Sequence, residues 1–246
     1  MISIKDEKDY LYNDSVEDEF SRIHFNLEMS AIDKKIKKII VTSSIKAEGK
    51  TIVSYNLSKN FAASGKKVAL LDLNLRNKKK YRYYKMIKSG KNIDIEFIKE
   101  KTNGGFDKIV YEKEEVYPSR VIESIEFNNL IKDLELNYDI IIIDTPPVLD
   151  YLDAVVTLKA TKDVLFVVRS DLTEKDDLKE AIGILEKAGA NILGLVLTMD
   201  LKNYKNTGWI MLIHCDGCYE GLKLGCKNLI LFSSYFFFKN IYKNNF

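Results

Sequence analysis

Five apolar segments recur along the chain, and polar residues bound each of them. Within each segment the apolar residues are mostly continuous and do not alternate with polar ones. This pattern is typical of strands that are buried on both faces of a parallel sheet. The segments are residues 37–43 (KKIIVTS), 67–74 (KVALLDLN), 139–147 (DIIIIDTPP), 163–170 (DVLFVVRS) and 191–198 (NILGLVLT).

Helical periodicity is found around and between these strands. Val53, Leu57 and Phe61 are four residues apart and form one apolar stripe, and Gly65 is placed to end that helix. Strands that alternate with helices predict an α/β protein with a doubly wound, mostly parallel sheet flanked by helices. Helices are expected at residues 15–30, 51–67, 124–139 and 173–189.

The composition is that of an ordinary globular protein. The 246 residues are 46% hydrophobic and 30% charged, with a net charge of +2, which gives no global attraction to nucleic acid. Residues 77–92 are basic and rich in tyrosine, and we interpret them as a solvated loop and helix face. We therefore expect no nucleic-acid partner.

The ends of the chain differ from its middle. Residues 1–14 are polar, with no secretory signal, and the apolar run 229–238 is too short to span a bilayer as a helix. The three cysteines all follow residue 214 and are not a disulfide framework. We predict a cytoplasmic protein with one domain at 1–200 and an atypical tail at 201–246.

The segment SSIKAEGKT, residues 43–51, leads from the first strand into a helix. It ends in Gly49-Lys50-Thr51, as a phosphate-binding loop does. In such a loop Lys50 would reach the β- and γ-phosphates and the Thr51 hydroxyl would ligate Mg²⁺. The strict pattern is broken because Ser44 replaces its first glycine, which predicts a P-loop NTPase with a deviant Walker A motif. The alternative is a chance Gly-Lys-Thr at the start of a helix.

Two acidic residues follow other strands and complete the expected site. Asp144 comes after four isoleucines and before Thr-Pro-Pro, the form of the second acidic motif of phosphate-loop enzymes, which helps to hold Mg²⁺. Asp72 ends the second strand, where it could serve the same metal or cap a turn. The carboxyl ends of parallel strands meet at one edge of a sheet, so we expect these groups to converge there.

From about residue 18 to residue 200, the chain resembles the bacterial tyrosine kinases (BY-kinases) of capsular and exopolysaccharide systems. The resemblance rests on the loop segment, on DIIIIDTPPVLDYLDA, on KDVLFVVRS and on ILEKAGANILGLVLT, in that family's order. It implies an ATP- and Mg²⁺-dependent protein tyrosine kinase that phosphorylates itself and regulates polysaccharide synthesis and export. It also implies tyrosine-containing protein substrates and a membrane adaptor, which would hold the kinase at the inner face of the cell membrane.

The resemblance assigns roles to particular residues. Lys50, Asp72, Asn74 and Asp144 occupy the catalytic positions, and Thr51, Asp72 and Asp144 the metal positions. The residues expected to bind the nucleotide are Ser44, Lys46, Ala47, Glu48, Gly49, Lys50, Thr51, Ile52, Arg76 and Arg169.

Two departures from the family pattern fall in the expected site. Ala47 replaces a loop glycine, and if this position needs a positive φ the methyl group introduces strain of about 1 kcal/mol. Asn74 replaces a second aspartate, and an amide can neither accept a proton nor lend a negative charge to Mg²⁺. These changes predict a weakened kinase, or a nucleotide-binding regulatory subunit that has lost transfer activity.

Two further departures concern assembly and the tail. The family forms rings through a helix with Glu-x-x-Arg-x-x-Arg, whereas here Glu19 and Arg22 are followed by Phe25. The incomplete motif counts against a ring but leaves a homo-oligomer open. Phe25 could also join the apolar side of the first helix. The tail lacks the family's tyrosine cluster, and we hypothesise that a change of reading frame produced it.

Two other readings of these motifs stay open. A partitioning or division-site ATPase of the ParA/MinD type shares the fold, but that group has a lysine where Ile45 stands here. In the tail, His214 with Cys215, Cys218 and Cys226 could offer zinc ligands, although chance is the favoured explanation because His214 and Cys215 are adjacent.

Overall fold

The structure is a computed structural model, and it contains the α/β fold that the sequence predicts. It describes residues 14–30, 36–75, 85–87, 97–111, 118–198 and 211–214. Arg76, most of the basic segment 77–92 and the three cysteines lie outside these residues. The expected division of the chain at residue 200 stays a prediction.

Nine strands form one sheet in the order β3-β4-β5-β2-β6-β1-β7-β8-β9. The six strands from β5 to β8 are parallel to their neighbours, while β3, β4 and β9 pair antiparallel at the two edges. The strands are β1 (Lys38–Ser43), β2 (Val68–Asp72), β3 (Lys85–Ile87), β4 (Phe97–Lys101), β5 (Asp107–Tyr111), β6 (Ile140–Asp144), β7 (Asp163–Arg169), β8 (Asn191–Thr198) and β9 (Met211–His214).

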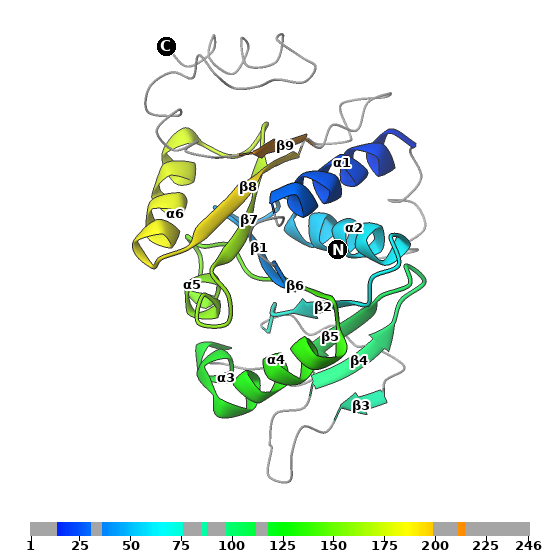
Figure 1. The fold of residues 1–246 in the computed structure, drawn as a ribbon. Coiled ribbons are helices and arrows are strands. Elements are labelled where there is room, and N and C mark those ends of the chain that lie inside the picture. The colour runs from blue at the N-terminus through cyan, green and yellow to red at the C-terminus, as the bar shows by residue number, and fades with distance from the viewer. Residues whose placement is uncertain are drawn as a thin grey trace, which may run out of the picture. The chain divides into compact units, whose positions relative to one another are not determined.

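Helices cover both faces of the sheet (Figure 1). α1 and α2 lie on one face, and α3 to α6 lie on the other, as right-handed crossovers in two directions require. The helices are α1 (Asp14–Ser30), α2 (Lys50–Ala63), α3 (Pro118–Glu123), α4 (Ile125–Asn137), α5 (Asp153–Thr157) and α6 (Lys175–Lys187). No helix in the described part of the chain is both long and apolar enough to cross a membrane.

The central strands are buried, which confirms the prediction that their continuous apolar sequences form strands covered on both faces of the sheet. Every residue of β6 is buried, as are five of the six residues of β1. The stripe Val53, Leu57 and Phe61 packs against this sheet, and Gly65 follows the helix with a φ of 88°. Phe25 does not join the apolar side of α1, because 60% of its surface is exposed.

The region between β2 and α4 is more regular than its sequence indicates. It contains β3, β4 and β5, of which β5 is a sixth parallel strand beside β2. Lys85–Ile87 lie in β3, which corrects the interpretation of that stretch as loop and helix face. α3 and α5 are short helices that the sequence did not predict.

The strand register brings the acidic residues of two motifs together. Asp72 and Asp144 are direct partners at the ends of the parallel strands β2 and β6. β1 lies on the other side of β6, so the loop that follows β1 is at the same edge of the sheet. The fold therefore positions a candidate site at the carboxyl ends of β1, β2 and β6.

Candidate nucleotide site

The loop between β1 and α2 turns through two residues with left-handed backbone. Ala47 has a φ of 66° and is the one non-glycine residue with positive φ in the described part of the chain. Gly49 has a φ of 93° and immediately precedes α2, where Val53 donates its N–H to the Gly49 carbonyl over 3.0 Å. The strain considered for Ala47 is therefore present in the folded protein.

The N-terminus of α2 presents free backbone donors to this loop. Among the hydrogen bonds of the described residues, none uses the N–H groups of Glu48, Gly49, Lys50 or Thr51. Unpaired N–H groups and the positive end of a helix dipole attract anions. This is the arrangement that a phosphate-binding loop requires.

Thr51 and Asp144 meet in the space beside the loop. The Thr51 hydroxyl donates to Asp144 Oδ2 over 2.7 Å, while Asp144 Oδ1 is buried and has no hydrogen-bond partner among the described residues. Burial, and secondarily the neighbouring Asp72, raise the pKa of Asp144 from 3.8 to about 7. A buried carboxylate oxygen without a partner is costly unless a cation or donor meets it.

These oxygens fit Mg²⁺. The ion prefers oxygen ligands, and proteins commonly supply only one or two carboxylates while substrate phosphates supply more. No three His, Cys, Asp or Glu side chains gather as a metal cage within the described ranges. Thr51 and Asp144 would thus hold Mg²⁺ together with a bound nucleotide, and not alone.

Lys50 is the buried cation of the site. Only 9% of its surface is exposed, and its ammonium lies 3.5 Å from the Ile45 carbonyl. Burial lowers the pKa of Lys50, and the carboxylates of Asp144 and Glu48 act in the opposite direction. An anion bound in the loop would stabilise the charged form of this lysine.

Asp72 is held by two contacts. Its Oδ1 accepts the Asn74 N–H over 3.0 Å, as in a turn cap, and its Oδ2 lies 3.5 Å from the ammonium of Lys108 in β5. The turn-capping role that the sequence left open is therefore present. Asn74 itself is exposed and lines the cavity described next, whereas Asp72 does not.

A cavity of about 650 Å³ collects most of the expected residues. This volume is within the usual range for small-molecule sites. Its lining also includes Tyr151, which the sequence analysis did not single out. Tyr151 lies under the Lys46 ammonium, 5.3 Å from the ring centre, and Asp150 is 3.5 Å from the same ammonium. The lining residues are Lys46, Ala47, Gly49, Lys50, Thr51, Ile52, Asn74, Asp144, Thr145, Pro146, Pro147 and Tyr151.

Three expected nucleotide-binding residues are not part of that lining. Ser44 is buried beneath the loop, and its carbonyl accepts the Leu149 N–H over 3.1 Å. Glu48 is also buried, and Arg169 contacts the loop from the end of β7, donating to the Ala47 carbonyl over 3.1 Å. The cavity itself therefore offers the loop, Asn74 and Asp144 to a ligand.

The chain resembles known proteins in both sequence and fold. Residues 37–170, more than half of the chain, match the family model described as ATPase MipZ. The tyrosine-protein kinase CpsD of Streptococcus pneumoniae is 29% identical over 191 residues, covering 74% of this chain and 83% of that protein. The tyrosine-protein kinase YwqD of Bacillus subtilis is 24% identical over 192 residues, covering 73% and 79%.

A solved structure shows the same arrangement of elements. The crystal structure of the chimerical protein CapA2B2 superposes with a TM-score of 0.63 and 27% identity, over 77% of this chain and 86% of that one. The predicted P-loop fold and the predicted resemblance are both confirmed by these matches. The chain belongs to the ATPase MipZ family, and its relatives are the bacterial tyrosine kinases that its motifs indicate.

Proposed function

We propose that this protein is an ATP- and Mg²⁺-dependent tyrosine kinase that phosphorylates itself and regulates capsule or exopolysaccharide synthesis. The observation that carries the proposal is the Asp144 carboxylate, buried beside Thr51 in the cavity that Lys50 also lines. The similarity of the chain to proteins named tyrosine-protein kinase supports tyrosine as the acceptor of the phosphoryl group. That assignment of the acceptor comes from the relatives, because the cavity alone would serve any nucleotide-dependent transfer.

The residues of the site can perform the parts of phosphoryl transfer that a protein supplies. Transfer depends mainly on positioning and on neutralising charge, and little covalent chemistry is needed. Lys50 and the free N–H groups of the loop would bind the β- and γ-phosphates. Thr51 and Asp144 would hold Mg²⁺, which when bound neutralises charge on the phosphate oxygens.

The acceptor tyrosine needs a base or a polar partner for its proton. A phenol has an ordinary pKa near 10, so a nearby carboxylate assists as the proton leaves. Asp72 is the candidate, one strand from Asp144. Its contacts with the Lys108 ammonium and the Asn74 N–H restrict the direction of its side chain.

The same proposal includes a partner and a place in the cell. The family resemblance implies a membrane adaptor, so we propose that the kinase lies at the inner face of the membrane through that protein. The tail that follows residue 200 lacks a tyrosine cluster. The substrates of the kinase would therefore include tyrosines of other proteins.

One experiment tests the activity directly. The purified chain is incubated with ATP and Mg²⁺, with and without the cytoplasmic segment of its adaptor, and with a glutamate–tyrosine copolymer as external acceptor. Phosphotyrosine is detected by antibody, and release of inorganic phosphate is measured in parallel. We expect phosphotyrosine from the natural chain and none from Lys50→Met.

A second candidate is a nucleotide-binding regulatory subunit without transfer activity. The observation that favours it is Asn74, an amide lining the cavity where the family has a carboxylate. Nucleotide binding without phosphotyrosine in any reaction would reject the kinase and leave this function. Phosphate release without phosphotyrosine would instead indicate an ATPase.

A further inference from the structure

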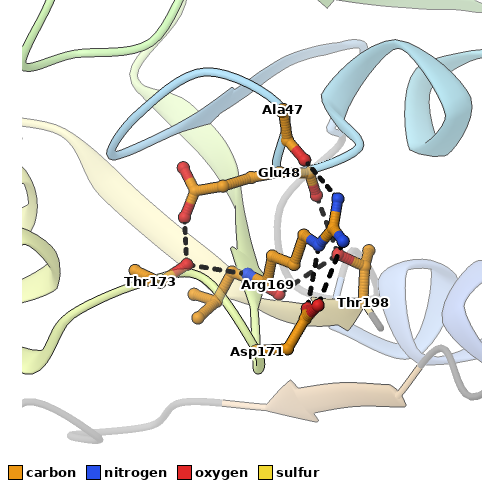
Figure 2. Close-up of polar contacts among 7 residues, drawn as sticks. Ala47, Glu48, Arg169, Asp171, Thr173 and Thr198 are labelled. Carbon is orange, nitrogen blue, oxygen red and sulfur yellow. Dashed lines mark hydrogen bonds and ion pairs between the residues drawn. The ribbon is translucent and has the colours of Figure 1, made fainter. Parts of the chain in front are cut away.

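Residues at and after the ends of β7 and β8 bind the phosphate loop through hydrogen bonds (Figure 2). Glu48 is the centre of this contact and is fully buried. Among loop residues 46–52, Glu48 alone does not line the cavity. Its side chain points toward the body of the protein, where its Oε2 accepts the Ile45 N–H over 2.6 Å and its Oε1 accepts the Thr173 hydroxyl.

Thr173 is itself fixed by the strand that precedes it. Its hydroxyl oxygen accepts the Arg169 N–H over 2.9 Å and donates to Glu48. The Arg169 side chain binds Asp171 through two hydrogen bonds of 2.8 and 3.0 Å. This pairing directs a third guanidinium donor to the Ala47 carbonyl over 3.1 Å. The turn after β7 therefore contacts the loop through several connected hydrogen bonds.

Thr198, the last residue of β8, holds the next carbonyl of the loop. Its hydroxyl donates to the Glu48 carbonyl over 2.8 Å and is buried. A Cβ on Gly49 would lie 3.5 Å from atoms of the Thr198 side chain, which is ordinary van der Waals contact. Thr198 thus packs directly beneath the glycine that precedes α2.

The direction of these carbonyls decides where the neighbouring amides point. In a trans peptide, the C=O of one residue and the N–H of the next point in opposite directions. Arg169 and Thr198 draw the carbonyls of Ala47 and Glu48 away from the cavity. The N–H groups of Glu48 and Gly49 must then face the cavity side, and neither has an acceptor among the described residues.

We propose that Thr173 and Thr198 are positioning residues for nucleotide binding, which act through Glu48 to aim the loop amides at phosphate without touching the nucleotide. Arg169 serves the same purpose at Ala47, whose left-handed backbone would otherwise relax. This inference rests on the proposed nucleotide-binding function. It adds two residues, 125 and 150 positions from Glu48 in the sequence, that the sequence analysis did not assign to the site.

The test uses paired substitutions in the full chain. Thr198→Val keeps the shape of the side chain and removes the hydroxyl, whereas Thr198→Ser keeps the hydroxyl. The dissociation constant of a fluorescent ADP analogue is measured with Mg²⁺, well below the melting temperature. Amide hydrogen exchange of a peptide covering residues 44–50 is measured without nucleotide. Thr173→Val and Thr173→Ser form a second pair, which keeps the test decisive if Thr198→Val does not fold.

We expect each valine variant to bind at least ten-fold more weakly and to exchange its loop amides faster, while each serine variant stays within about three-fold of the natural chain. Normal binding and normal exchange in both valine variants would overturn the proposal. Equal losses in the valine and serine variants would also overturn it, because packing and not the hydroxyl would then be responsible. If the natural chain binds no nucleotide, the proposed function fails, and loop exchange in the valine variants still decides whether the hydroxyls hold the loop.

Discussion

Replacement of Ala47 by glycine should stabilise the folded protein. A left-handed backbone costs a non-glycine residue about 1–2 kcal/mol, and Ala47 has a φ of 66°. Glycine removes that cost, but it increases the conformational freedom of the unfolded chain, which offsets about 0.4–1 kcal/mol. Ala47 is exposed, so little buried apolar surface is lost with its methyl group. We therefore expect a net gain of about 0.5–1 kcal/mol.

The free energy of unfolding is measured by urea denaturation of the nucleotide-free chain, and the melting temperature by circular dichroism. For a chain of this length a gain of this size raises the melting temperature by about 1–4 °C. Ala63→Gly is the matched control, because Ala63 is also exposed but is the last residue of α2 and has no positive φ. There the same change should destabilise by up to about 1 kcal/mol.

Both substitutions remove one methyl group from an exposed alanine. Opposite signs of the two changes in unfolding free energy would therefore show that the backbone strain at Ala47 causes the difference. If Ala47→Gly lowers the free energy of unfolding as much as Ala63→Gly does, the loop is not strained and the reasoning is wrong. A stabilisation of Ala47→Gly with no effect at Ala63 would still support strain, because helix ends tolerate glycine better than helix interiors.

Three other predictions concern Asp144, Asn74 and Tyr138. Because burial raises the folded-state pKa of Asp144 to about 7, the free energy of unfolding should fall as pH rises from about 4 to about 7, by at most about 1.4 kcal/mol per pH unit. Urea titrations of the metal-free protein should show that Asp144→Asn lacks this part of the pH dependence. Asn74→Asp should raise phosphotyrosine formation at least ten-fold, because it restores a carboxylate to the cavity lining, and an unchanged rate would show that the amide is not limiting. Tyr138→Phe should cost about 1–2 kcal/mol of stability without altering nucleotide affinity, because the Tyr138 hydroxyl bridges Lys99 and Asp107 at the opposite end of the sheet.

The central strands could be predicted from the sequence because burial on both faces leaves a continuous apolar pattern. β5 lacks that pattern, since Lys108 lies within it and only Ile109 and Val110 are buried. The polar residue is tolerated because its ammonium pairs with Asp72 across the sheet. A strand whose polar residue is satisfied by a distant carboxylate cannot be recognised from local composition.

Some residues of the candidate site could likewise be predicted from the sequence, and others could not. Lys50, Thr51 and Asp144 follow from short motifs, because strand ends and helix starts impose local spacing on them. Thr173 and Thr198 could not be found in this way, since their contacts with Glu48 depend on how the ends of β7 and β8 meet the loop. Hydroxyl groups that bind a loop across the fold leave no pattern in the neighbouring sequence.

The two departures from the family pattern should affect different steps. The strain at Ala47 is opposed by fixed contacts, because Arg169 holds its carbonyl and Thr198 holds the next one. Nucleotide binding should therefore persist. The change at Asn74 is of another kind, because an amide can neither accept a proton nor lend a negative charge to Mg²⁺. A loss of activity in this chain should thus be a loss of kcat with KM for ATP little changed, and a raised KM at normal kcat would place the defect in the loop instead.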